Sequence, residues 1–267
     1  MKRIIIVTGA SSGLGIEFAR QLVRTRDADE IWLIARRKDK LEGLANELSG
    51  LKKGEAYIIS RVIALDLGGS PGVRHFQKLL EDERAAGEFA IDTLVNNAGF
   101  GTYGTFRETP LDRELEMIDV NVYALTGLCH AAIPFMGKGS MIINVASLAG
   151  FIPLGNFAVY GATKAYVLSF STALAAEVAD SGIFVSTVCP GPVDTEFASV
   201  ASNGAREKVV DGKNPAAVVA HCLRSAGKGR HIAIMAVKWK FKAFMSRFMG
   251  RYFFARHTYV HEKRPTR

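Results

Sequence analysis

A phenol and an ammonium lie four residues apart in the segment YGATK, as Tyr160 and Lys164. At this spacing two side chains share one face of a helix. A positive charge close to a tyrosine favours the phenolate, so the phenol could exchange a proton nearer neutral pH than its ordinary pKa of about 10 allows. The same spacing also occurs on solvated helix surfaces. The pair by itself therefore leaves a catalytic and a structural interpretation open.

A glycine-rich turn, TGASSGLG, occupies residues 8–15, directly after a short apolar run and before an amphipathic one. Gly9, Gly13 and Gly15 permit a tight turn and a close approach of the backbone to a ligand. The free N–H groups and the dipole of the helix that follows favour an anion such as a pyrophosphate. We expect a dinucleotide site here, with a purely structural turn as the alternative.

The end of the second expected strand indicates which dinucleotide binds. Dinucleotide-binding units commonly place an acid there, on the adenosine ribose hydroxyls. This chain has Ala35 at that point, followed by Arg36 and Arg37. Because a guanidinium can bind a phosphate through two parallel hydrogen bonds, the pattern favours NADP(H), with NAD(H) as the second choice. The alternative is that both arginines are solvated residues at the start of a helix.

The elements that must position these residues follow a β-α order. Continuous apolar runs, typical of parallel strands buried on both faces, alternate with longer amphipathic stretches. The sequence predicts an α/β fold, a doubly wound parallel sheet of Rossmann-like type with about seven strands and helices on both faces. The expected strands are residues 3–8, 31–35, 57–65, 91–96, 141–147, 183–189 and 231–236. The expected helices are residues 14–26, 38–49, 71–86, 111–136, 158–181 and 214–227.

Composition favours one large domain. The 267 residues are 48% hydrophobic and 22% charged, which supplies enough apolar side chains for a sizeable core. We expect residues 1–237 to form a single dinucleotide-binding and catalytic domain. The apolar run after the two N-terminal basic residues is too short for a signal peptide, and no run approaches the ~18 residues of a spanning helix. Cys129, Cys189 and Cys222 are far apart and lack a C-x-x-C pair, so we expect no disulfide and no metal site, but buried reduced thiols in a cytoplasmic protein.

The formal charge of +8 is concentrated at the C-terminus. Residues 238–267 carry nine Lys/Arg and one Glu, whereas the charges of residues 1–237 balance. Residues 238–254 place apolar side chains on one helical face and basic ones mainly elsewhere, a pattern typical of a peripheral membrane helix. The favoured alternative is that the apolar face covers the substrate pocket or a neighbouring subunit. The extension matches no recognisable nucleic-acid-binding fold, so no nucleic acid is expected as a partner.

Further short motifs follow one another along the chain. NNAG occupies residues 96–99, ALD ends at Asp66, DVNVYA contains an asparagine, NVAS ends in a serine, and PGPVDT occupies residues 190–195. With the glycine turn and YGATK, these motifs make the chain resemble the short-chain dehydrogenase/reductase family, in its short, single-domain branch. The resemblance spans about residues 3–236. Each motif is weak alone, but the set is very specific.

The resemblance implies an oxidoreductase that transfers a hydride between a nicotinamide and a carbonyl or alcohol carbon. It implies that Tyr160 supplies or removes the proton and that Ser147, thirteen residues before it, hydrogen-bonds the developing alkoxide. Lys164 would bind the nicotinamide ribose, and Asn121 would hold a water that connects Lys164 to solvent. No metal is needed for such a reaction. The expected cofactor-binding residues are Gly9, Ser11, Ser12, Gly13, Leu14, Gly15, Arg36, Arg37, Asp66, Leu67, Asn97, Ala98, Gly99, Tyr160, Lys164, Pro190, Gly191, Val193 and Thr195.

Two other classes of function compete with this interpretation. A dinucleotide-binding redox sensor without turnover is one, but it would have no use for the acid. A nucleotide-sugar epimerase or dehydratase is the other, and it would usually show a different glycine spacing and a larger C-terminal domain.

The substrate is expected to be a small carbonyl compound or alcohol, with a mild preference for an apolar one. A lid at residues 196–215 and the loop at 100–110 should line the pocket. The candidate apolar walls, several of which would serve equally well as core, are Phe100, Tyr103, Phe151, Phe157 and Phe197. The resemblance also implies a homodimer or homotetramer formed through the helices expected at 111–136 and 158–181. Their small residues that would permit close approach include Ala131, Ala132, Ala173, Ala175 and Ala176.

Overall fold

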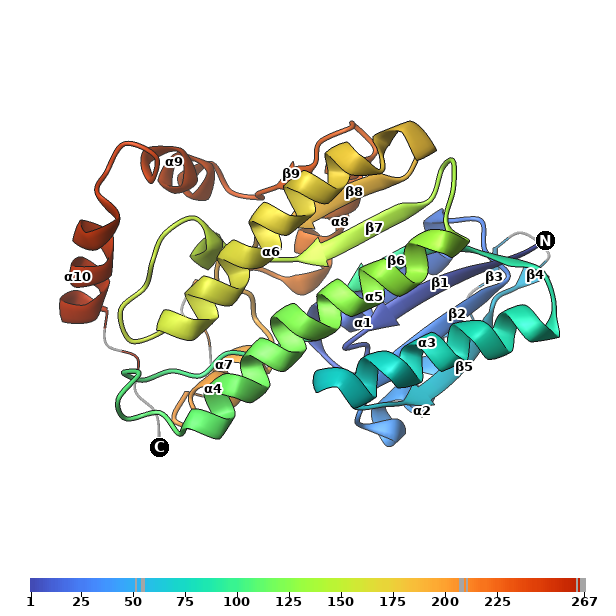
Figure 1. Ribbon diagram of the computed structural model, residues 1–267, viewed down its shortest axis with the longest axis horizontal. Coiled ribbons are helices and arrows are strands. Elements are labelled where there is room, and N and C mark those ends of the chain that lie inside the picture. The colour runs from blue at the N-terminus through green and yellow to red at the C-terminus, as the bar shows by residue number, and fades with distance from the viewer. Residues whose placement is uncertain (51, 54–55, 207–208, 210, 263, 265–267) are drawn as a thin grey trace.

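The computed structural model describes residues 1–267 except 51, 54–55, 207–208, 210, 263 and 265–267. Seven strands form one sheet in the order β5-β2-β1-β6-β7-β8-β9, and every neighbouring pair is parallel (Figure 1). The predicted doubly wound sheet is confirmed. The strands are β1 (Lys2–Thr8), β2 (Glu30–Ala35), β5 (Ile59–Ala64), β6 (Phe89–Asn96), β7 (Met141–Val145), β8 (Phe184–Val188) and β9 (Ile232–Ala233).

Helices cover both faces of the sheet (Figure 1). On one face α1 (Gly13–Thr25), α2 (Lys38–Ser49) and α8 (Pro215–Ala226) share a core with the strands, built around side chains such as Phe18 and Leu41. On the other face α3 (Gly69–Ala86), α5 (Leu125–Ala132) and α6 (Ala158–Glu177) bury a second set that includes Phe76 and Val167. The central strands are therefore buried from both sides, which is why they are mostly apolar rather than alternating, whereas the edge strand β5 is partly exposed and carries Ser60 and Arg61.

Two predicted elements are subdivided. The long helix expected at 111–136 is α4 (Leu111–Ile118), a π-helical turn at Asp119–Ala124, α5, and a short 3₁₀ turn at Ile133–Phe135. The π-helical turn carries Asn121, whose side chain is buried and bonded to the backbone of Phe100. The strand expected at 57–65 begins instead at Ile59, because β4 (Ala56–Tyr57) pairs with β3 (Lys52–Lys53) in a separate hairpin.

The C-terminal extension also differs from the prediction of one helix over 238–254. It forms α9 (Val237–Met245) and α10 (Arg251–His261), which lie together at one end of the molecule (Figure 1). The chain turns over residues 246–250 and Gly250 caps α10, consistent with the cost of about 1 kcal/mol that glycine imposes inside a helix. Of the nine basic residues predicted here, Lys263 and Arg267 lie outside the described residues.

The cysteines behave as predicted, since Cys129, Cys189 and Cys222 are free and buried. In the part of the chain that the structure describes, no helix is long and apolar enough to cross a membrane. In the same residues, no group of three or more His, Cys, Asp or Glu side chains is placed to hold a metal ion.

Candidate active site

A cavity of about 930 Å³ opens at the carboxyl ends of the central strands. It receives residues from the turns that follow β1, β2, β6, β7 and β8. The strand order reverses between β1 and β6, and ligands of open α/β sheets bind beside this reversal. Ligand pockets commonly measure about 300 to 1,000 Å³, so this cavity is at the large end of that range.

The glycine turn forms one wall of the cavity and has the geometry of an anion site. Gly9 and Gly13 have φ of +64° and +54°, a region that favours glycine. A Cβ on Gly15 would lie 2.1 Å from the carbonyl oxygen of Gly9, so no side chain fits at this position. The side chain of Ser12 makes no capping hydrogen bond to α1. The Ser12 hydroxyl thus leaves the N–H groups at the start of α1 free of a side-chain cap, which suits a phosphate.

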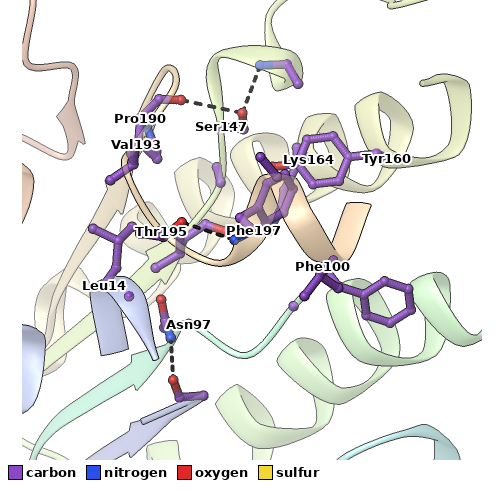
Figure 2. Close-up of a pocket in the computed structure, with 18 of the residues that line it drawn as sticks. Leu14, Asn97, Phe100, Ser147, Tyr160, Lys164, Pro190, Val193, Thr195 and Phe197 are labelled. Carbon is purple, nitrogen blue, oxygen red and sulfur yellow. Dashed lines mark hydrogen bonds between the residues drawn. The ribbon is translucent and has the colours of Figure 1, made fainter. Parts of the chain in front are cut away.

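The NNAG turn after β6 is bonded directly to the glycine turn. The Thr8 hydroxyl donates to the Val95 carbonyl and accepts from the backbone N–H groups of Asn97 and Ala98, each at 3.0 Å. The Asn97 amide donates to the carbonyls of Thr8, at 3.0 Å, and of Gly9, at 3.2 Å. Asn97 therefore fixes the backbone on which a dinucleotide would rest (Figure 2).

Both arginines after β2 line the cavity, but each already has partners. Arg37 forms an ion pair with Glu196 at 2.9 Å and donates to the backbone carbonyl of Ser11 at 3.2 Å. Arg36 is 62% exposed, 3.5 Å from a Glu116 carboxylate oxygen and 4.0 Å from one of Asp66. The pairing of Arg37 with Glu196 joins the glycine turn to the start of the expected lid, a link that sequence reasoning missed.

Of the four predicted catalytic residues, Asn121 lies in the π-helical turn, and Ser147, Tyr160 and Lys164 come from the turn after β7 and from α6. Ser147 lies in the turn after β7, where its hydroxyl accepts from the Ala149 N–H at 3.1 Å and donates to the Pro190 carbonyl at 3.5 Å. Tyr160 and Lys164 lie one turn apart on α6 and face the same cavity (Figure 2). The prediction that the pair shares one helix face is confirmed.

Burial dominates the electrostatics of the tyrosine and the lysine. It raises the pKa of Tyr160 above its ordinary value, while a hydrogen bond with Ser147 and the charge of Arg264 act in the opposite direction. Burial also lowers the pKa of Lys164 to about 8, partly offset by Cys189. The Lys164 ammonium donates to the Val145 carbonyl at 2.8 Å and lies 5.7 Å from the centre of the Tyr160 ring. Burial is the largest cause of the raised pKa of Tyr160 in this structure, and the tuning of the phenol by Lys164 stays a prediction.

Most of the predicted site residues line this cavity, but Gly15 and Asn121 do not. The amide of Asn121 accepts from the Phe100 N–H at 3.1 Å and donates to the Phe100 carbonyl at 2.9 Å and to the Thr163 hydroxyl at 3.1 Å. Asn121 thus orders the turn that carries Phe100. The predicted residues that line the cavity are Gly9, Ser11, Ser12, Gly13, Leu14, Arg36, Arg37, Asp66, Leu67, Asn97, Ala98, Gly99, Ser147, Tyr160, Lys164, Pro190, Gly191, Val193 and Thr195.

Aromatic side chains surround the phenol. The ring of Tyr160 stacks on Phe157 with centroids 4.2 Å apart, and Phe197 lies 5.4 Å from it. Tyr103 meets the far side of Phe157 edge-on, at 4.8 Å. All five candidate apolar walls, Phe100, Tyr103, Phe151, Phe157 and Phe197, line the cavity. Residues 207, 208 and 210 of the expected lid lie outside the described residues.

The C-terminal extension closes the cavity from one side, through Trp239 and Lys242 of α9 and Arg264 beyond α10. The Arg264 guanidinium donates to the Gly155 carbonyl at 3.1 Å, pairs with Glu262 at 3.2 Å and lies 4.9 Å from the Phe157 ring centre. Burial lowers its pKa. No local motif marks Arg264, since the fold alone brings it to the site. The sequence indicated that an apolar face formed by Phe241, Phe244, Met245, Phe248 and Tyr252 would cover the pocket. That choice of face was wrong, because none of these side chains lines the cavity and most are exposed, whereas Trp239, on another side of α9, does line it.

Comparison with known proteins agrees with this geometry. The family model described as short chain dehydrogenase matches residues 3–206. Sulfoacetaldehyde reductase 2 of Chromohalobacter salexigens is 34% identical over 211 residues, which are 76% of this chain and 78% of the relative. The probable oxidoreductase EphD of Mycobacterium tuberculosis is 31% identical over 246 residues, 89% of this chain. This chain spans about two fifths of the length of EphD, since the match covers 40% of that protein.

A solved structure shows the same fold. A short-chain dehydrogenase from Sphingobium yanoikuyae in complex with NADPH superposes with a TM-score of 0.77 and 28% identity, covering 92% of this chain and 93% of that one. The chain therefore belongs to the short-chain dehydrogenase/reductase family.

Proposed function

We propose that this chain is an NADP(H)-dependent oxidoreductase that interconverts a carbonyl and an alcohol, with Tyr160 as the general acid and base. One observation carries the proposal. Ser147, Tyr160 and Lys164 open into the same cavity as the glycine turn and the two arginines after β2. A single ligand-binding space thus holds a proton donor, a hydroxyl for an oxyanion and an anion site.

The residues fit a dinucleotide. The glycine turn leaves room for a pyrophosphate on α1, and Asn97 fixes its backbone. Asp66 and Leu67 would contact the adenine side, Pro190, Gly191, Val193 and Thr195 the nicotinamide side, and Lys164 the ribose between them. When bound, the nicotinamide supplies or accepts the hydride.

The chain's own residues then handle the proton and the oxygen. In the direction of reduction, Tyr160 gives its phenolic proton to the carbonyl oxygen. Its raised pKa keeps that proton in place until charge develops on the substrate. Ser147 donates a hydrogen bond to the same oxygen. Its present bond to the Pro190 carbonyl is long, at 3.5 Å, and is easily exchanged for a substrate.

Lys164 places a positive charge beside Tyr160, since a pKa of about 8 leaves it mostly charged at neutral pH. Its bond to the Val145 carbonyl fixes the side chain from the strand side. Asn121 positions the turn of Phe100, and the water-binding role that the family resemblance implies for it is part of the proposal. A redox sensor without turnover is the alternative, and it predicts no NADPH consumption with any carbonyl compound.

The choice of NADP(H) rests on Arg36 and Arg37. A charge-assisted hydrogen bond contributes about 1.5 to 3 kcal/mol, so Arg36→Ala should weaken NADPH binding roughly 10- to 100-fold. NADH, which lacks the 2′-phosphate, should lose less than about threefold. Calorimetric titration of both cofactors measures this, with the exposed Arg24→Ala on α1 as the matched control. Equal losses for NADPH and NADH would exclude a phosphate-binding role for Arg36.

The walls around Tyr160 favour a carbonyl compound with an apolar body. Phe157, Phe197 and Tyr103 present ring surfaces to the cavity, and such surfaces gain free energy by excluding water from an apolar ligand. A panel of ketones and aldehydes of increasing apolar size, followed by the loss of NADPH absorbance, tests this. Turnover confined to small hydrophilic carbonyls would contradict it.

A second substrate class is favoured by one specific observation. The Arg264 guanidinium lies beside Phe157, and that of Arg206 lies 5.6 Å from the Tyr103 ring centre, so positive charge borders the same walls. An aldehyde that carries an acidic group would suit this edge, and the name of the Chromohalobacter relative indicates such a substrate for that enzyme. Arg264→Gln should then raise KM for acidic aldehydes at least about tenfold and leave neutral ketones unchanged. The apolar class predicts no such difference.

We also propose that the chain forms a homodimer or homotetramer through the helices at 111–136, which are α4 and α5, and through α6. Ala132 and Ala175, expected to permit close approach of a second subunit, are instead buried within their own chain. They were wrong choices, because the face they occupy packs on the sheet. The exposed apolar residues of this region are Leu111, Leu115, Ile118, Tyr123 and Tyr166.

A further inference from the structure

The C-terminal helix α9 has two apolar faces, and the body of the protein covers one of them. Trp239 and Ala243 are 6% exposed and pack against the core that includes Val167 and Ile234. On the opposite side, Val237, Phe241 and Phe244 are 81%, 64% and 54% exposed. These three recur at i, i+4 and i+7, so they form one stripe that points away from the body.

The stripe continues beyond α9. Phe248 is 69% exposed in the turn after the helix, and its ring lies 5.1 Å from that of Phe244. Tyr252 and Phe253, at the start of α10, are 80% and 55% exposed. We call Val237, Phe241, Phe244, Phe248, Tyr252 and Phe253 the aromatic ridge. Scattered apolar residues on a surface are ordinary, but a run of this length over two consecutive elements marks an interaction surface.

Basic side chains flank the aromatic ridge. Lys238, Lys240, Arg247 and Arg251 are exposed, and among the described residues none of them forms a salt bridge. On a helical projection Lys238 and Lys240 fall on either side of the stripe of α9. Long basic side chains in such positions extend toward lipid headgroups while the apolar residues between them enter the acyl region.

The charge of this surface favours one of its two candidate partners, a second copy of the chain or an anionic membrane. A second copy of the chain joined by a two-fold axis would place the same basic residues against one another, which is unfavourable. An anionic lipid surface complements them, and residues 1–237, with balanced charges, do not oppose the attraction. Val237, Phe241 and Phe244 also offer no hydrogen-bonding group, which suits hydrocarbon.

We propose that the aromatic ridge and its flanking basic residues form a docking surface for an anionic membrane, so that the enzyme binds peripherally through α9 and the start of α10. The inner face of α9 simultaneously lines the catalytic cavity through Trp239 and Lys242. Membrane binding does not depend on the proposed reaction, and its test needs no substrate.

The test is flotation of the full chain with vesicles of phosphatidylcholine alone or with about 30 mol% phosphatidylglycerol, at about 50 mM and about 500 mM salt. The protein should float with the anionic vesicles at low salt and at least about tenfold less at high salt or with the neutral vesicles. A protein that remains at the bottom of the gradient under every condition overturns the proposal.

Two sets of variants locate the surface. Phe241→Ser, Phe244→Ser and Phe248→Ser together keep the charge and should weaken vesicle binding at least about tenfold. Their matched control is Ile59→Ser, Phe106→Ser and Ile232→Ser, three residues exposed by 66%, 62% and 37% elsewhere, which should bind as the parent does. None of the six lines the cavity, so NADPH affinity and thermal unfolding serve as folding controls.

The second set reverses charge. Lys238→Glu with Lys240→Glu should reduce binding at least about tenfold, whereas Lys78→Glu with Arg84→Glu, an equal change of net charge on the exposed side of α3, should reduce it less than about threefold. Equal losses in both pairs would show that binding is diffuse and would refute a defined surface. The ridge could instead join two subunits. In that case the parent would not bind vesicles, and the variant at Phe241, Phe244 and Phe248 would show a lower mass by light scattering. That result would also refute the proposal.

Discussion

Lys164 is a buried cation, and replacing it should stabilise the protein while removing its function. Burial of this charge lowers the free energy of unfolding, as the fall in the pKa of Lys164 from 10.5 to about 8 indicates. Such a difference corresponds to about 3 kcal/mol against the charged form. In Lys164→Met this cost disappears, but the Val145 carbonyl loses its donor at a cost of about 1 to 2 kcal/mol. The net expectation is a free protein more stable by about 1 to 2 kcal/mol at pH 7.

The sign of the pH dependence gives a sharper test. Below pH 8 the lysine is charged in both the folded and the unfolded protein, so the cost is fully present. Between about pH 8 and 10.5 the folded protein loses the proton first, and the cost of burial decreases as the pH rises. The stability difference between Lys164→Met and the parent should therefore shrink from pH 7 to pH 9.5. Lys164→Met should at the same time lose most of its NADPH affinity and turnover.

Urea unfolding of the cofactor-free protein at the two pH values measures both quantities. Lys40→Met, an exposed lysine on α2, is the matched control and should change stability by less than about 0.5 kcal/mol at either pH. If Lys164→Met is less stable than the parent at pH 7, or if its difference from the parent is the same at both pH values, the reasoning about the buried charge is wrong.

Three further predictions follow from close packing. Gly15→Ala would place its Cβ 2.1 Å from the Gly9 carbonyl oxygen, so it should lower the free energy of unfolding by about 2 kcal/mol and weaken NADPH binding. Gly43→Ala, whose Cβ would lie in open space, should lower neither the stability nor the affinity for NADPH. Trp239→Ala removes the side chain that packs α9 on the body, and the free energy of unfolding measured in urea should fall by about 3 kcal/mol. A fall below about 1 kcal/mol would show that α9 is not packed on the body. Ile118→Glu should lower the mass measured by light scattering if α4 joins subunits, whereas Phe106→Glu should not, and an unchanged mass in both would exclude α4 from the interface.

Local patterns were sufficient to predict the sheet and most of the candidate site. The β-α periodicity predicts all seven strands of the main sheet, because strands buried on both faces are mostly apolar. The glycine turn follows β1 and NNAG begins at the end of β6, so the parallel topology brings them to one cavity, and YGATK reaches the same cavity from the first half of α6.

The features that sequence reasoning missed depend on contacts between distant segments. The ion pair of Arg37 with Glu196 joins residues 159 positions apart, and Arg264 meets Gly155 across 109 positions. No periodicity encodes such contacts. The tuning of Tyr160 by Lys164, expected from spacing and from the family resemblance, stays a prediction. The local sequence does not indicate the burial that raises the pKa of the phenol, nor the bond of the ammonium to the Val145 carbonyl.

The central claim is that Tyr160 supplies the proton in a carbonyl reduction at this site. Its most direct test compares the parent with Tyr160→Phe, which keeps the ring stacked on Phe157 and removes only the hydroxyl. Single-turnover loss of NADPH absorbance is measured with a carbonyl compound that the parent reduces, and NADPH affinity is measured in parallel. The account predicts a rate at least about 100-fold lower, the scale of general acid catalysis, with NADPH affinity changed less than about threefold. A variant that reduces the compound at the parent's rate would contradict it.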